Sequence, residues 1–234
     1  MWASLLTEPL FCLPFTLGVY LGSSWIYRKT KIILFQPMLL TMAILIVLLI
    51  LTHTPYDSYA KASWLIDFLL GPSVVALGCL LYDQMEVLKG RLFSTLVSIF
   101  IGALVGIVTA AGIVLLLGGG KVLAASMGPK SVTTPIAISL SAKSGGIPAL
   151  TAVVVVITGL FGGLVSPFLF KVLRIHNPIA KGLALGTSAH GMGTATAIQL
   201  GAVEGALAGM AIGIMGFFTA ILMPLISYIT SLFS

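Results

Sequence analysis

Two polar stretches, each with one ionisable side chain at its centre, stand out in a chain that is otherwise strongly apolar. The first, residues 127–146, carries Lys130 with hydroxyl residues close behind it. The second, residues 181–201, carries His190 among glycines and hydroxyl residues. A lysine beside hydroxyl groups can bind a carboxylate, and a histidine, whose ordinary pKa is about 6.5, can carry a proton at physiological pH. We predict that the two stretches are facing walls of one polar pocket.

Lys130 is predicted to be the cationic contact of that pocket. An ammonium group at mid-membrane depth is disfavoured by about 2.5–3.5 kcal/mol, so it must meet an anion or reach the interface. The alternative to an anion site is that the long lysine stem snorkels to the membrane surface. The predicted substrate contacts are Lys130, Ser131, Thr133 and Thr134 on the first wall, and Thr187, Ser188 and Thr194 on the second.

His190 is predicted to couple substrate movement to proton movement. At helical spacing Thr187, His190 and Thr194 share one face. Gly191 and Gly193 leave room around the ring. The alternative is a structural role, in which a neutral imidazole is hydrogen-bonded to a hydroxyl group of the next helix. Both roles place the side chain inside the protein rather than against lipid.

The composition predicts an all-α polytopic membrane protein. Of 234 residues, 59% are hydrophobic and 8% are charged, and the mean hydropathy is +1.16. A water-soluble globule with this composition lacks the polar surface to cover itself. Since a spanning helix needs about 20 apolar residues, the chain has room for about seven or eight membrane segments in one integral domain covering residues 1–234.

The net charge of +6 is explained by membrane orientation rather than by nucleic acid. The basic residues are scattered in short loop clusters without interleaved aromatic residues, so no nucleic-acid partner is predicted. The densest cluster is Arg28, Lys29 and Lys31, which the positive-inside rule places in the cytoplasm, with the N-terminus outside. Cys12 and Cys79 have no metal-type spacing, and neither a metal nor a cofactor is predicted.

Three membrane segments, near residues 64–82, 122–143 and 178–200, are predicted to be interrupted or re-entrant. Their small polar breaks are Gly71-Pro72-Ser73, Gly128-Pro129-Lys130-Ser131 and Gly186-Thr187-Ser188, which start 57 and 58 residues apart. This spacing indicates a transporter-like internal repeat, although 26 glycines could also produce it by chance. A re-entrant Lys130 stretch is favoured because it keeps Lys171, Arg174 and Lys181 on the cytoplasmic side.

An enzymatic function is not predicted. The sequence contains no P-loop, no HExxH and no GxSxG motif. It has six acidic residues, most of them in expected loops, so paired catalytic carboxylates are improbable.

Three segments resemble the LrgB/CidB family: PKSVTTPIA at 129–137, RIHNPIAKGLALGTSAHGMGTATA at 174–197 and GAVEGALAGMA at 201–211. The pattern GTSxHxxGTA at 186–195 is the most specific part, and the resemblance covers nearly the whole chain. It implies a multi-pass protein of the bacterial plasma membrane, paired with a smaller LrgA/CidA-type membrane protein. It also implies kinship to the LrgB-like half of the plant plastidic glycolate/glycerate translocator.

The resemblance implies two functions of different classes. One is a proton-coupled carrier of small monocarboxylates of the pyruvate or glycolate type; the other is a holin/antiholin-like protein that regulates murein hydrolases and autolysis. A carrier of an anion needs a buried cation and broken helices, whereas a lytic pore needs neither. Lys130 and His190 therefore favour the carrier, with a small carboxylate, the lipid bilayer and further copies of the chain in a homo-oligomer as the expected partners.

Overall fold

The computed structural model describes residues 5–30, 35–83, 86 and 89–232 of the chain. The regular elements in these ranges are helices, and none of them is a strand, which confirms the predicted all-α class for this part of the chain. The chain divides into two compact units, Met1–Val75 and Ala76–Ser234, which are described separately. The single integral domain expected from the composition stays a prediction.

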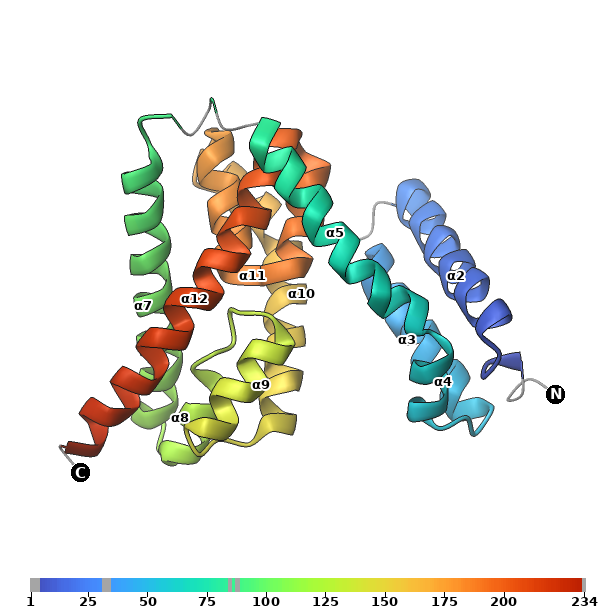
Figure 1. Cartoon of the computed structure of the whole chain (residues 1–234), viewed down its shortest axis with the longest axis horizontal. Helices are drawn as coiled ribbons and strands as arrows, with labels where there is room; N and C mark the ends of the chain where they lie inside the picture. Colours follow the sequence, from blue (N-terminus) through green and yellow to red (C-terminus); the bar gives the residue numbers. More distant parts are fainter. Residues whose placement is uncertain (1–4, 31–34, 84–85, 87–88, 233–234) are drawn as a thin grey trace. The chain divides into compact units, whose positions relative to one another are not determined.

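The first unit is a small helical group built around helix α2. Its elements are α2 (Pro9–Thr30), α3 (Pro37–Leu51), α4 (Tyr56–Ala62) and the beginning of α5 (Trp64–Asp83) (Figure 1). Cys12, Tyr59 and Ala62 are buried together, and the Tyr59 hydroxyl oxygen lies 2.6 Å from Oγ1 of Thr16. This contact fixes the short helix α4 on α2. Lys31, part of the predicted cytoplasmic cluster, lies outside the described residues.

The interruption predicted near residues 64–82 is not seen in helix α5. The helix continues through Gly71-Pro72-Ser73, with Pro72 in its interior. A proline removes one helical hydrogen bond, but apolar membrane helices tolerate it where neighbouring groups compensate. The first of the three aligned breaks is therefore not a break in a helix, and the repeat itself stays a prediction.

The second unit is built on three long helices with shorter or broken elements between them (Figure 1). The long helices are α7 (Leu92–Leu116), α10 (Pro148–Val172) and α12 (Ala202–Leu232). The intervening elements are α8 (Gly120–Met127), α9 (Thr134–Lys143) and α11 (Pro178–Leu200). Helix α11 packs against both α10 and α12, and α12 packs against α7.

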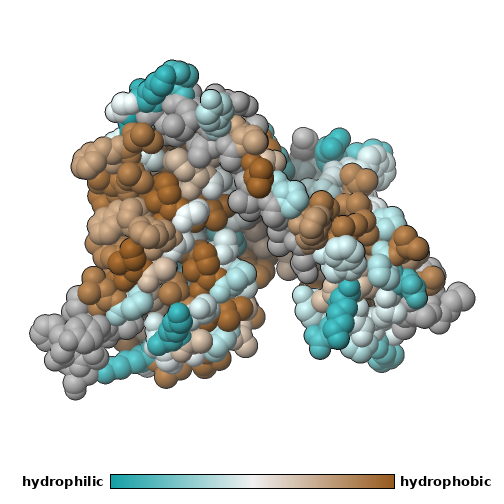
Figure 2. Space-filling view, in the orientation of Figure 1, coloured by the Kyte–Doolittle hydropathy of each residue, from teal (hydrophilic) through white to brown (hydrophobic). Residues whose placement is uncertain are grey.

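Four helices in the described ranges are long and apolar enough to cross a membrane: Pro9–Thr30, Leu92–Leu116, Pro148–Val172 and Ala202–Ile226. Large apolar side chains cover their surfaces; Phe93 and Leu116 of α7, for example, are 82% and 88% exposed. Figure 2 shows this as a brown surface over α7. Exposed apolar area of this extent fits contact with lipid rather than water. The chain is a membrane protein; the total of seven or eight segments stays a prediction.

Helices α8 and α9 form a hairpin that returns to the end of the unit where α7 finishes, as expected for the predicted re-entrant segment. Helix α8 follows α7 directly, and its Ser126 accepts a hydrogen bond from the backbone N–H of Ile147, at the start of α10, with 2.8 Å between Oγ and N. Because the eight-residue α8 is only about 12 Å long, the end of α7 and the start of α10 lie close together. The chain between them therefore leaves this end of the unit and returns to it.

Buried hydroxyl groups close this hairpin at its base. Oγ1 of Thr151 on α10 lies 2.7 Å from Oγ of Ser141 on α9 and 2.9 Å from the carbonyl oxygen of Ser126 on α8. All three residues have no exposed surface. Hydrogen bonds among buried hydroxyl groups satisfy polar atoms that lipid could not.

Helix α11 reverses direction at His190 and forms a second hairpin. His190 has φ 43° and ψ −130°, which no helical residue adopts. On its N-terminal side, a Cβ placed on Gly182 would lie 2.6 Å from the carbonyl oxygen of Glu204, and one on Gly186 would lie 2.8 Å from Cα of Ala208. The contacts with α12 are thus four residues apart in both helices and follow the same order. This arm of α11 therefore runs parallel to α12.

The C-terminal arm of α11 must return toward its own start, because α12 begins only two residues after Leu200. A Cβ on Gly193 would lie 2.8 Å from Cβ of Ala189 and in contact with the backbone of Leu185. Leu185 and Ala197 are also buried in one cluster. The two arms therefore pack on each other, and α11 enters from the end where α7 begins, opposite to the α8–α9 hairpin.

Candidate functional site

The tips of the two hairpins meet helix α7 on neighbouring turns, close to its middle. A Cβ on Gly102 would lie 4.0 Å from Cβ of Thr187, near the tip of the α11 hairpin. A Cβ on Gly106 would lie 3.8 Å from Oγ of Ser131, at the tip of the α8–α9 hairpin. These glycines flank Leu104, the central residue of the 25-residue helix. Both predicted walls therefore contact the middle of α7, on neighbouring turns, and the single pocket between them stays a prediction.

Lys130 lies at the tip of the α8–α9 hairpin, in the six-residue break between the two helices. Its Nζ donates a hydrogen bond to Oγ of Ser131 over 3.2 Å. The side chain is half-buried, while its neighbours Pro129 and Val132 are almost fully buried. The position far from the hairpin base argues against simple snorkelling to that end.

The N-terminus of α9 follows directly and adds its own positive character. Thr133 is the N-cap residue, with extended backbone, and no side-chain capping bond satisfies the first turn. The hydroxyl groups of Thr133 and Thr134 are half-buried beside these free N–H groups. A helix N-terminus presents about half a positive charge and unpaired donors, which suits an anion. The lysine, the hydroxyl groups and the helix end together form a donor-rich tip.

His190 lies at the tip of the α11 hairpin and is 6% exposed. Its Nε2 is 3.0 Å from the carbonyl oxygen of Val155 on α10. Since that oxygen can only accept, the neutral ring carries its hydrogen on Nε2, and Nδ1 is the atom that can take a second proton. The bond goes to a backbone carbonyl, so the predicted structural alternative with a hydroxyl partner is wrong in that detail.

A glycine stripe on α10 makes room for this tip. A Cβ on Gly159 would lie 2.6 Å from Cε1 of His190, and one on Gly162 would lie 2.6 Å from Cβ of Ala189. Farther along, Oγ1 of Thr196 donates to the carbonyl oxygen of Gly163 over 3.3 Å. The break at His190 is thus held against α10 by close backbone approach. Gly159 was not among the predicted site residues.

The hydroxyl residues of α11 are divided between two surroundings, contrary to the prediction of one shared helical face. Thr187 faces α7, whereas Thr194 is 4% exposed and donates to the carbonyl oxygen of His190 over 3.1 Å. Ser188 is exposed and donates to the carbonyl oxygen of Ala184. The prediction assumed a continuous helix, and the reversal at His190 removes that periodicity.

Thr219 on α12 lies in the same region, but it was not among the site residues predicted from the sequence. It is 1% exposed, and its hydroxyl group has no hydrogen-bond partner among the described residues. It shares a helix face with Gly216, which approaches Ile136 of α9, and with Met223, whose side chain meets Gly128. An unpaired buried hydroxyl group beside the break is a further donor for a bound molecule. In the sequence Thr219 is simply one hydroxyl in an apolar run.

The fold is that of a helical membrane protein in which two helical hairpins contact neighbouring turns of one long helix, α7. The sequence profile of the LrgB-like family matches residues 16–229. The chain belongs to the LrgB-like family, as its resemblance predicted.

Related bacterial proteins match the chain over nearly its full length. The chain is 37% identical over 209 residues to "Uncharacterized protein YwbG" of Bacillus subtilis (strain 168), covering 89% of this chain and 93% of that protein. It is 32% identical over 218 residues to "Antiholin-like protein LrgB" of Bacillus mycoides (strain KBAB4), covering 93% and 95%. The LrgB protein of Bacillus cereus (strain B4264) is 31% identical over the same length. No solved structure matches the chain.

Proposed function

We propose that this chain is an antiholin-like membrane protein that restrains murein hydrolases and autolysis in the bacterial plasma membrane. The observation that carries the proposal is 31–32% identity to antiholin-like LrgB proteins over 93% of the chain. These names favour the antiholin-like alternative over the carrier that the residues alone favour. The proposal includes a small LrgA/CidA-type membrane protein as partner, assembly into a homo-oligomer, and an N-terminus outside the cell.

The first prediction concerns lysis. In a Bacillus cereus strain lacking its own LrgB, expression of this chain is expected to slow detergent-induced autolysis severalfold relative to an empty vector. The reason is that an antiholin-like protein opposes the membrane events that release murein hydrolases. The measurement is the fall in culture turbidity, with membrane expression checked by immunoblot. Lysis as fast as with the empty vector would exclude the proposal.

A second candidate, a carrier of small monocarboxylates, is favoured by the geometry of the hairpins. Carriers place their substrate site near the bilayer midplane, where interrupted helices meet. Here Thr187 and Ser131 approach α7 on either side of its central residue. A donor-rich tip around Lys130 would bind the carboxylate, and the tip at His190 would supply the titratable group.

The two walls would contact different parts of the substrate. The proposed carboxylate contacts are Lys130, Ser131, Thr133 and Thr134, with Thr219 as an addition, and those to the rest of the substrate are Thr187, Ser188 and Thr194. Nδ1 of His190 would take or release the coupled proton. Movement of one hairpin against α7 would then expose the site to one side of the membrane at a time.

The second prediction tests His190. Replacing it by Gln keeps a hydrogen-bond donor for the Val155 carbonyl oxygen but removes the atom that takes a proton. Pyruvate uptake by proteoliposomes, assayed from about pH 5.5 to 7.5, is then expected to lose its dependence on pH. Uptake rates measured across that range provide the check, with Gln at the exposed His176 as the matched control. A profile with the wild-type slope in His190→Gln would show that the histidine is structural.

We infer that lysis control and carboxylate movement share one site. A protein that changes the flow of small carboxylates alters the state of the membrane on which lysis depends. A direct pore-type regulator would instead leak a neutral fluorescent dye from liposomes without selective uptake. Selectivity and leakage measured on one preparation thus separate the two mechanisms.

A further inference from the structure

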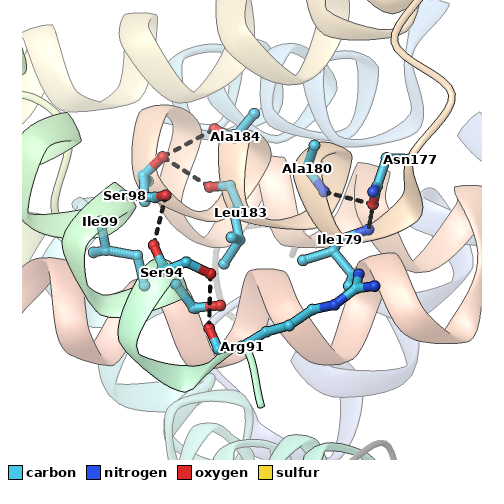
Figure 3. Close-up of a pocket in the computed structure, with 11 residues that line it drawn as sticks. Arg91, Ser94, Ser98, Ile99, Asn177, Ile179, Ala180, Leu183 and Ala184 are labelled. Atoms are coloured by element: carbon cyan, nitrogen blue, oxygen red, sulfur yellow. Dashed lines mark hydrogen bonds between the residues drawn. The ribbon is translucent and has the colours of Figure 1, made fainter. Parts of the chain in front are cut away.

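A cavity of about 430 Å³ lies between the first turns of α7 and the N-terminal arm of α11 (Figure 3). Its polar lining consists of Arg91, Ser94, Thr95, Ser98, Asn177 and Thr187. The volume falls in the range of about 300–1,000 Å³ that small-molecule pockets occupy. Lys130 and His190 do not line this cavity, and Thr187 is the residue that it shares with the hairpin tips.

The cavity offers donors and a positive charge but no carboxylate. Among the described residues, the lining contains no acidic residue, and Glu86, five residues before Arg91, is paired with Lys89. Oδ1 of Asn177 accepts from the N–H groups of Ile179 and Ala180 over 2.9 and 3.3 Å. The amide NH₂ of Asn177 therefore remains free to donate.

The hydroxyl groups of the lining are of two kinds. Oγ of Ser94 and Ser98 donate to the backbone carbonyl oxygens of Arg91 and Ser94, as the dashed lines in Figure 3 show. Thr95, by contrast, is 3% exposed, and it lines the cavity. The donors of the lining thus include the Arg91 guanidinium, the Asn177 amide and the Thr95 hydroxyl, and a small oxyanion matches all three.

The position of the cavity links one end of the unit to the hairpin tips. Arg91 is the N-cap residue of α7, and Thr187 at the other side of the cavity approaches Gly102. One turn farther along α7, Gly106 approaches Ser131, to which Lys130 donates. One face of α7 therefore carries a row of hydroxyl groups and glycines. Arg91 lies at one end of this row, and Lys130 of the α8–α9 hairpin lies near the other.

We propose that this cavity is a binding site for a small carboxylate anion, held by Arg91, Asn177 and Thr95. Its further role as the entrance to the tip site rests on the carrier function proposed above; the binding itself does not. Arginine suits this task because its planar fork binds a carboxylate with two parallel hydrogen bonds.

The test is equilibrium binding of radiolabelled pyruvate to the purified full-length chain in detergent. The Lys130→Met background is used so that the tip site does not contribute. Replacing Arg91 by Gln is expected to weaken binding at least about tenfold, as loss of a charge-assisted hydrogen bond does. Lys89→Gln, two residues away and exposed, is the matched control and should bind like its parent. Size-exclusion profiles confirm that each variant is folded.

Equal binding by the Arg91→Gln and parent chains would overturn the proposal. Displacement of pyruvate by phosphatidylglycerol, with stronger Arg91-dependent binding of that lipid, would also overturn it, because the cavity would then hold a lipid headgroup. Failure of the carrier function is distinguishable, since it would abolish uptake in liposomes while leaving Arg91-dependent binding in detergent unchanged.

Discussion

Replacement of Lys130 by Met is expected to reduce pyruvate uptake by proteoliposomes about tenfold to a hundredfold, toward the level of empty liposomes. Methionine is similar in length and apolar, so it fills the same space without the charge. The variant loses the one cation at the hairpin tips, and a hydrogen bond to a charged group contributes about 1.5–3 kcal/mol. The measurement is the initial rate of radiolabelled pyruvate uptake.

The matched control for this variant is Lys121→Met, in the same hairpin. Lys121 is exposed in the first turn of α8, away from the tip. It should retain wild-type uptake, which shows that loss of a positive charge is not sufficient. If Lys130→Met transports pyruvate like the wild type, the binding role of Lys130 is wrong; the carrier function is wrong if the wild-type chain itself takes up no more pyruvate than empty liposomes.

Replacement of Gly186 by Ala is expected to destabilise the second unit by about 1–3 kcal/mol, the usual effect of overpacking, or by more. The added Cβ would lie 2.8 Å from Cα of Ala208 and 2.8 Å from Cβ of Ala211 on α12, and closer still to the carbonyl oxygen of Ala208. Backbone atoms cannot move aside as a flexible side chain can. Thermal unfolding in detergent, followed by circular dichroism, should show a lower Tm.

Gly213→Ala is the control for this prediction. Gly213 is also helical, but a Cβ there would meet nothing within 4 Å. The same substitution should therefore leave the Tm unchanged or raise it slightly, because alanine favours a helix over glycine by up to about 1 kcal/mol. Equal Tm values for the two variants would contradict the close approach of α11 and α12.

Apolar run length predicted the long helices of the second unit well. The continuous runs after Arg91 and Gly146 became α7 and α10, because a membrane segment must satisfy its backbone within a helix. The run through Gly71-Pro72-Ser73 shows the limit of composition. Gly and Pro weaken a helix but do not decide whether neighbouring contacts hold it together, and α5 continues there.

The two centres of the site, Lys130 and His190, were predictable because an ionisable group in an apolar segment needs a protein surrounding. Their arrangement was not predictable in the same way. Helical spacing placed Thr187 and Thr194 on one face with His190, but a positive φ at a non-glycine residue reverses the chain there. Sequence periodicity carries no sign of such a reversal, since glycines at 191 and 193 are equally compatible with helix packing.

The contributions of α10 and α12 were invisible for a related reason. Gly159 and Thr219 lie within smooth apolar runs, and only the packing of other helices gives them a place beside the tips. Long-range contacts of this kind depend on which helix faces meet, and a single sequence does not specify these faces. Lys130 and His190 could therefore be proposed as site residues from the sequence, while the residues packed around them required the fold.

Detergent-induced autolysis most directly tests whether lysis control and carboxylate movement share one site. The assay uses the Bacillus cereus strain lacking LrgB and compares the wild-type chain with Lys130→Met, expressed at equal levels in the membrane. The wild-type chain is predicted to slow lysis, and Lys130→Met is predicted to lyse as fast as the empty vector. Protection by Lys130→Met equal to that of the wild type would contradict the shared site and leave the hairpin tips without a part in lysis control.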